Sequence, residues 1–137
     1  METLMSRSLG KIAANIATIF FAVVIVLQLL LAVGILPASM AWGGRQPELT
    51  PGLQMASIVA AFILALFAYV IRRRAGLVGT TAPSRWIKIA SWLITGFMVL
   101  NTVGNITSLS AGERMLFTPV TIILAVSCFM VSISKTE

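Results

Sequence analysis

The sequence predicts an all-α integral membrane protein, a single domain over residues 1–137 in which four transmembrane helices form a bundle. Two observations favour this fold. Of the 137 residues, 58% are hydrophobic and only 10% are charged, a composition too apolar for a soluble domain of this length. The apolar residues also gather in four stretches, each long enough at about 1.5 Å per helical residue to cross a hydrocarbon core of roughly 30 Å. The expected spans are 12–36, 53–71, 86–109 and 111–133.

The basic residues are unevenly distributed between the connections, and this predicts the orientation of the bundle. Of the ten lysines and arginines, only Arg45 lies in the first connection, and only Arg114 lies beside the third, in the first turn of the fourth span. The others precede the first span, flank the second connection or follow the fourth span: Arg7, Lys11, Arg72, Arg73, Arg74, Arg85, Lys88 and Lys135. Because such residues accumulate on the cytoplasmic side of membrane proteins, we expect both termini in the cytoplasm and the Pro37–Gly52 connection outside. The net charge of +6 then indicates orientation and not a nucleic-acid partner.

Prolines and hydroxyl side chains set the expected ends of the first three helices. Pro37 is expected to stop the first helix, because proline cannot continue the helical hydrogen bonding. Thr50 and Pro51 should open the second helix, with threonine as the N-cap and proline at the first helical position. Ser84 is expected to cap the third helix in the same way.

The fourth helix is expected to begin with a capping box formed by Ser110 and Glu113. In such a box the hydroxyl accepts from the backbone of the glutamate, and the carboxylate accepts from the backbone of the serine. A helix that began only at Pro119 would be short for a membrane span, so we expect it to begin near Ala111 and to contain Pro119.

The third helix carries a polar face, because Asn101, Gly104, Asn105 and Ser108 follow the spacing i, i+3, i+4, i+7. Amide side chains are costly in hydrocarbon unless they form hydrogen bonds, so this face should point at other helices or at a cavity. Polar residues at similar depth in the other spans extend the group. The candidate cluster comprises Gln28, Ser57, Asn101, Thr102, Asn105 and Thr121.

This polar cluster has two interpretations. Amide and hydroxyl side chains commonly join transmembrane helices by hydrogen bonds, and in that case Gln28 is the expected partner of Asn101. The alternative is a polar pocket that is open to the outside. The sequence is compatible with both a filled core and an open pocket.

The sequence offers no combination of residues that would activate a nucleophile or hold a metal. It contains no histidine and a single cysteine, Cys128, inside the fourth apolar stretch. Without a histidine, a buried lysine or a buried carboxylate, nothing would activate the serines and threonines. We therefore expect no enzymatic activity, no catalytic residue, no metal and no cofactor. Glu113 is interpreted as a helix cap and Arg114 as an anchor for lipid headgroups, both at the outer interface.

The connections and helix ends carry four short motifs: Ala41-Trp42-Gly43-Gly44, Glu48-Leu49-Thr50-Pro51-Gly52, Asn101-Thr102-x-Gly104-Asn105, and Ser110-x-x-Glu113-Arg114 followed by Pro119. With these motifs the chain resembles uncharacterised small bacterial membrane proteins with four transmembrane helices, for which no activity is known. The resemblance would extend over nearly the whole chain and implies the bacterial plasma membrane as its location.

The leading functional hypothesis from the sequence is a non-enzymatic interaction or accessory subunit. Such a protein would contact the lipid bilayer and pack against a second copy of itself or another membrane protein. The alternative is a small-solute transporter or channel that uses the polar cluster in the outer half of the bundle. A cavity that reaches both Gln28 and Asn101 would favour the alternative, whereas a closed bundle would favour the accessory role.

Reporter fusions test the predicted orientation. A reporter that is active only in the cytoplasm should be active when fused after Glu137 and inactive when inserted in the Pro37–Gly52 connection. An external C-terminus, or a number of spans other than four, would contradict the orientation.

Overall fold

The structure of the chain is a computed structural model that describes residues 2–44 and 48–135. All of the regular structure in this part of the chain is helical. The four long helices are each long and apolar enough to cross a membrane, which confirms the predicted fold class. The elements are α1 (Glu2–Ala32), η1 (Ala38–Met40), η2 (Trp42–Gly44), α2 (Pro51–Arg74), α3 (Arg85–Ile106) and α4 (Ala111–Ile133).

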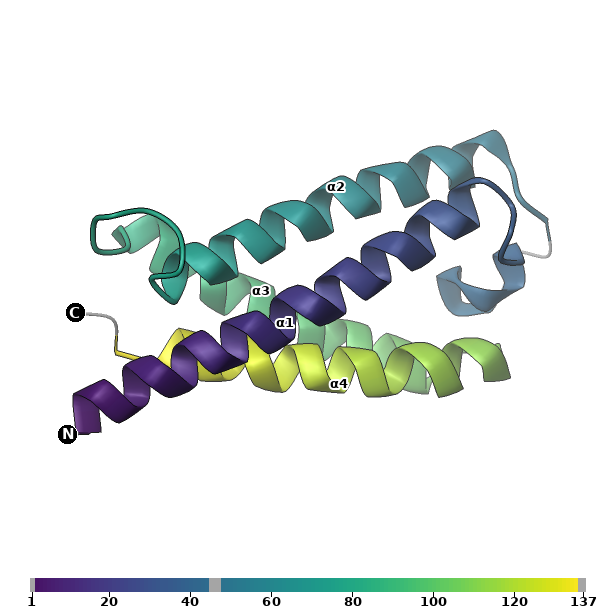
Figure 1. Cartoon of the computed structure of the whole chain (residues 1–137). Helices are drawn as coiled ribbons and strands as arrows, with labels where there is room; N and C mark the ends of the chain where they lie inside the picture. The colour runs from purple at the N-terminus through teal and green to yellow at the C-terminus, as the bar shows by residue number, and fades with distance from the viewer. Residues whose placement is uncertain (1, 45–47, 136–137) are drawn as a thin grey trace.

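The four helices alternate in direction, so that the connections lie at two opposite ends of the bundle (Figure 1). Both termini and the α2–α3 connection lie at one end, which we call the basic end because it carries Arg72–Arg74 and Arg85. The α1–α2 and α3–α4 connections lie at the other end, which we call the distal end. Arg45, which was expected outside the membrane, falls outside the described residues.

The expectation that Pro37 stops the first helix is wrong, because α1 already ends at Ala32. Gly34 follows with a φ of 82°, a left-handed conformation that glycine adopts without steric cost. The N–H of Ile35 then donates to the carbonyl of Leu30 at 3.0 Å, the hydrogen bond that defines a Schellman motif. The glycine therefore ends the helix before the proline is reached. At its other end, α1 begins at Glu2, ten residues before the expected span.

The predicted caps of α2 and α3 are present. The hydroxyl of Thr50 accepts a hydrogen bond from the N–H of Leu53 at 3.2 Å, and Pro51 occupies the first turn of α2. The hydroxyl of Ser84 accepts from the N–H of Ile87 at 3.4 Å. These side chains satisfy backbone donors that the first helical turn leaves without intrahelical partners.

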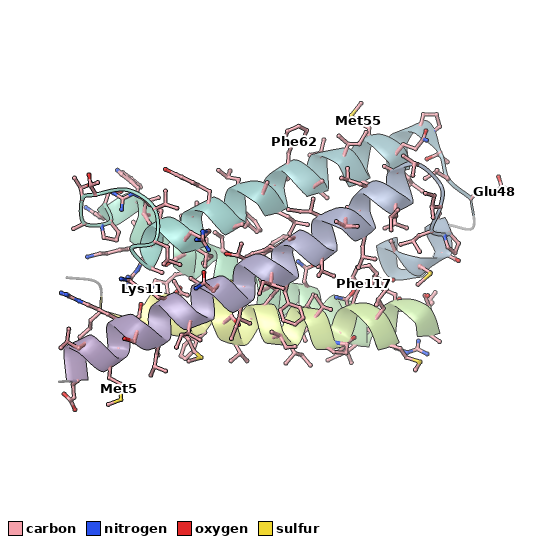
Figure 2. All side chains as sticks on the ribbon, in the orientation of Figure 1. Met5, Lys11, Glu48, Met55, Phe62 and Phe117 are labelled. Atoms are coloured by element: carbon pink, nitrogen blue, oxygen red, sulfur yellow. The ribbon has the colours of Figure 1, made fainter. Side chains whose placement is uncertain are left out.

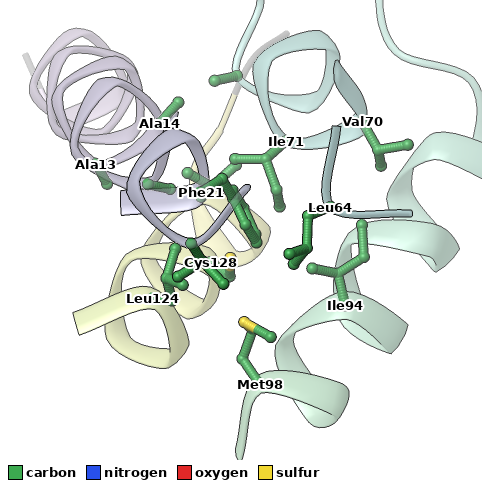
Figure 3. Close-up of a cluster of buried hydrophobic side chains, with 14 of the residues drawn as sticks. Ala13, Ala14, Phe21, Leu64, Val70, Ile71, Ile94, Met98, Leu124 and Cys128 are labelled. Carbon is green, nitrogen blue, oxygen red and sulfur yellow. The ribbon is translucent and has the colours of Figure 1, made fainter. Parts of the chain in front are cut away.

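The half of the bundle near the basic end is tightly packed. Small residues of α1 are buried there at helical spacing, and Gly10 lies so close to the end of α4 that a Cβ atom on it would be 2.6 Å from Oγ of Ser134. Glycine and alanine allow such close approach between transmembrane helices. Toward the middle of the bundle, larger side chains from all four helices meet (Figure 3). This core includes Ala13, Ala14, Phe21, Leu64, Ile71, Ile94, Met98, Leu124 and Cys128.

Two of the arginines at the end of α2 form hydrogen bonds with two different parts of the chain. Nη1 of Arg72 donates to Oδ1 of Asn15 on α1 at 2.9 Å. Nη2 of Arg73 donates to Oγ1 of Thr81, in the α2–α3 connection, also at 2.9 Å. The sequence indicated only that these cations mark one side of the membrane. In the structure they also fasten neighbouring segments to α2.

Arg74 is buried, and its guanidinium reaches the end of α4. Nη2 donates to the carbonyl oxygens of Ser132, at 3.0 Å, and Ser134, at 2.9 Å. The last carbonyls of a helix lack intrahelical donors and form the negative end of its dipole, so a cation is favourable there. The basic end is therefore closed by small side chains and by a charge-assisted contact between α2 and α4.

The helices are less evenly packed at the distal end. α1 packs along α2 and α4, and α3 packs along α4, whereas α2 and α3 meet over a shorter length. The α1–α2 hairpin consequently diverges from the α3–α4 hairpin toward the distal end (Figure 1). This divergence positions the cavity described below.

The close packing of Gly10 is tested by comparing it with a glycine that has space around it. Gly10→Ala should lower the free energy of unfolding by roughly 1 to 3 kcal/mol, because the new methyl group overlaps the Ser134 side chain. Gly96→Ala, on α3, is the control, since no atom lies within 4 Å of the added Cβ and alanine favours the helix by up to about 1 kcal/mol. Unfolding in mixed micelles measures both. Equal effects of the two substitutions would contradict the close contact.

Candidate functional site

A cavity of about 620 Å³ lies between the two hairpins in the distal half of the bundle. Its volume lies within the range of roughly 300 to 1,000 Å³ that is typical of sites for small molecules. Phe117 lies on the side of α4 that faces the other hairpin, whereas Met55 and Phe62 of α2 point away from the bundle (Figure 2). The apolar part of the wall includes Val24, Leu64, Phe97, Met98, Phe117 and Leu124.

Four of the six residues in the predicted polar cluster line this cavity: Gln28, Asn101, Asn105 and Thr121. The other two lie outside its wall. The hydroxyl of Thr102 donates to the carbonyl of Met98 in its own helix at 2.9 Å. Ser57 is buried in α2, with 1% of its surface exposed. Similar depth in the membrane thus predicted that these residues lie in one region. Whether a side chain reaches the cavity also depends on which face of its helix it occupies.

Asn105 joins two helices. Its Nδ2 donates to Oγ1 of Thr121 on α4 at 3.3 Å, slightly longer than an ordinary hydrogen bond between nitrogen and oxygen. The Thr121 hydroxyl is within hydrogen-bonding distance, 3.0 Å, of the carbonyl of Phe117 in its own helix. The interpretation of the cluster as a contact between helices therefore applies to this pair.

The predicted hydrogen bond between Gln28 and Asn101 is wrong. Oε1 of Gln28 is buried and has no hydrogen-bond partner in the part of the chain that the structure describes. Asn101 lines the same cavity from α3. The reason is the arrangement of the helices: α1 packs along α2 and α4 and has at most a slight contact with α3, so the cavity separates these two amides.

Glu113 lies in the wall of the cavity and forms only half of the predicted capping box. The hydroxyl of Ser110 accepts from the N–H of Glu113 at 3.2 Å, as expected. The N–H of Ser110, however, donates to Oγ of Ser108 at 3.1 Å and not to the carboxylate. The Ser108 hydroxyl in turn donates to Oε2 of Glu113 at 2.7 Å. Ser108 thus replaces the carboxylate as the cap of the Ser110 backbone, and Glu113 is left facing the cavity.

The charge of Glu113 is both buried and unpaired. Only 8% of the residue is exposed, and no ion pair joins it to a basic residue among those that the structure describes. The neighbouring Arg114 is exposed, and its guanidinium donates to the carbonyl oxygen of Ser108. The sequence predicted a capping role for Glu113 and a headgroup anchor at Arg114, both at the outer interface; in the structure Glu113 lines the cavity, whereas Arg114 is exposed beside it.

The α1–α2 connection covers the distal end of the cavity. Ala41 and Gly43 contribute to its wall. The carbonyl of Gly43 accepts a hydrogen bond from the N–H of Leu109 at 3.0 Å, which fastens the connection to the turn between α3 and α4. Sequence reasoning missed this contribution, because a glycine-rich connection indicates a turn but does not show what the turn packs against.

Comparison with the models of known protein families, with curated protein sequences and with solved structures found no match to this chain. The chemistry of the site is therefore argued from its own residues. Its polar groups are amides, hydroxyls and one carboxylate, which suit binding through hydrogen bonds and charge. The described residues contain no group of three or more histidine, cysteine or acidic side chains that could hold a metal ion.

Asn101 and Asn105 should respond differently to the loss of their polarity. Asn105→Leu should lower the free energy of unfolding by roughly 0.5 to 1.5 kcal/mol, because it removes a hydrogen bond between α3 and α4. Asn101→Leu should leave the stability unchanged or raise it, because the amide forms no hydrogen bond with the residues that the structure describes. Unfolding of both variants in mixed micelles measures the difference. If Asn101→Leu proves as costly as Asn105→Leu, Asn101 holds helices together after all.

Proposed function

We propose that this protein is a non-enzymatic membrane carrier that binds a small solute in the distal cavity. The observation that carries the proposal is that the cavity reaches both Gln28 and Asn101, which supports transport over a closed accessory bundle. A buried amide oxygen without a partner is unfavourable, and Oε1 of Gln28 is such an atom. A bound solute would supply the missing hydrogen-bond donor.

A carrier fits the packing better than a channel does. The basic half of the bundle is filled by side chains such as Ala14, Ile71, Cys128 and Val131, which are fully buried. The cavity therefore ends near the middle of the bundle. A carrier that works by alternating access has two states, and in each of them the binding site is open toward one side of the membrane and closed toward the other. The closed basic half and the distal cavity match one of these states.

The contacts at the basic end indicate what would have to move. For the solute to leave through that end, the close contact between Gly10 and Ser134 and the hydrogen bonds of Arg74 to the end of α4 would have to open. Both contacts involve α4, so α4 is the helix whose displacement would open the basic end.

The orientation and the location of the carrier follow from the sequence. The clustered basic residues place the basic end in the cytoplasm, so that the cavity belongs to the outer half of the membrane. The resemblance to small bacterial membrane proteins favours the bacterial plasma membrane. Neither nucleic acid nor a metal is expected as a partner.

Filling the cavity tests whether it binds a solute. Both Gly104 and Gly96 lie on α3 with no atom within 4 Å of an added Cβ, but only Gly104 lines the cavity. A screen of small solutes should find compounds that raise the melting temperature of the wild type, since a ligand at about 100 times its Kd adds about 2.7 kcal/mol of stability. Gly104→Leu should abolish this shift.

Gly96→Leu is the matched control and should keep the shift, because the added side chain has the same size on the same helix but lies outside the cavity. A shift that survives in Gly104→Leu would place the solute elsewhere. The absence of any stabilising solute would contradict the carrier and favour the accessory role.

A further inference from the structure

We propose that the solute is an amphipathic organic cation, which enters from the bilayer between α2 and α3 and places its ammonium group against Glu113. This inference rests on the proposed function and specifies the class of solute.

The first argument is the charge of Glu113. Its carboxylate lines the cavity, and the residue is 8% exposed. The one hydrogen bond it receives from a side chain comes from the Ser108 hydroxyl, and no described basic residue pairs with it. A buried charge is unfavourable unless an opposite charge compensates it. A cationic ligand would supply that charge.

The second argument is the sign of the whole cavity. Neither lysine nor arginine occurs among the described residues that line it. The amide side chains of Gln28 and Asn101 also line the cavity, and Oε1 of Gln28 is buried without a donor among the described residues. A carboxylate and an unsatisfied amide oxygen, with no lysine or arginine beside them, favour a positively charged ligand and disfavour an anion.

The third argument is the apolar remainder of the wall. Leu64, Met98 and Leu124 line the cavity and also belong to the core at the middle of the bundle. Phe117 adds an aromatic ring from α4, the helix that carries Glu113, and aromatic rings attract cations. A ligand that fills this space must therefore have an apolar body beside its charged group.

The fourth argument is the route of entry. The connection at Gly43 covers the distal end, while α2 and α3 meet over a shorter length than α1 and α2 or α3 and α4 do. Three residues that line the cavity at this seam are also largely exposed: Ile63 (42%), Phe97 (47%) and Leu100 (70%). These side chains lie on helices that cross the membrane, so the opening faces lipid. An amphipathic molecule dissolved in the bilayer can reach the cavity by this route.

Two probes that differ only in charge test the recognition of the cation. Benzyltrimethylammonium and neopentylbenzene have the same shape, but a carbon atom replaces the charged nitrogen in the second. In dodecyl maltoside micelles, which contain no ammonium, the wild type should bind the cationic probe more tightly than the neutral probe. Glu113→Gln should weaken binding of the cation by about 10- to 100-fold, because it removes the Coulombic attraction between the carboxylate and the quaternary ammonium, and should leave binding of the neutral probe unchanged.

Glu48→Gln is the matched control, because Glu48 is an exposed carboxylate at the same end of the molecule but outside the cavity (Figure 2). It should leave the affinities of both probes unchanged. If the wild type binds both probes equally, or if Glu113→Gln does not discriminate between them, the inference is overturned while the carrier stands. If neither probe binds and no solute stabilises the protein, both proposals fail. The comparison on the wild type needs no variant, so it holds even if Glu113→Gln does not fold.

The ammonium group has two natural sources, a free amphiphile and a phospholipid headgroup. Added phosphatidylcholine should compete with benzyltrimethylammonium if the headgroup is the ligand, and phosphatidylglycerol should not. Competition by neither lipid would support a free amphiphile. Equal competition by both lipids would overturn recognition of the charge, because phosphatidylglycerol carries no ammonium.

Discussion

The arrangement of the bundle depends on how closely α1 approaches the end of α4 at the basic end. Gly10 and the buried alanines after it remove the side-chain volume that would hold these helices apart. Arg74 adds a buried contact from α2 to the last carbonyls of α4. With three helices fastened at one end and α2 and α3 in contact over a short length, the hairpins can diverge at the other end, and the cavity is the result.

The polar side chains in the distal half of the bundle fall into two groups, those that form hydrogen bonds within the protein and those that face the cavity. Asn105 and Thr121 satisfy each other across α3 and α4, and Thr102 bonds to its own helix. Gln28, Asn101 and Glu113 instead face the cavity. Because hydrocarbon offers no hydrogen-bond partner, groups that are not used for packing are retained only where water or a ligand can reach them. This division separates structural from binding residues within one cluster.

The local chemistry at the start of α4 illustrates how a small change of partner alters the role of a residue. In a complete capping box the Glu113 carboxylate would be occupied by the Ser110 backbone. Ser108 takes that place through its hydroxyl, and the same hydroxyl donates to the carboxylate. Glu113 therefore becomes part of the cavity wall and supplies its one charge among the described lining residues.

The sequence by itself determined the four apolar helices, the caps at Thr50 and Ser84, and the polar face of α3, because these depend on composition, on residues close in the chain and on helical periodicity. It could not determine the end of α1. Both Gly34 and Pro37 can end a helix, and the structure shows that the helix ends at the glycine, which comes first in the chain. The separation of Gln28 from Asn101, the partner of Arg74 and the burial of Glu113 in the cavity wall were decided only by the tertiary structure. Each of these depends on which helices pack together, a property of side-chain volumes on different helices that no single stretch of sequence contains.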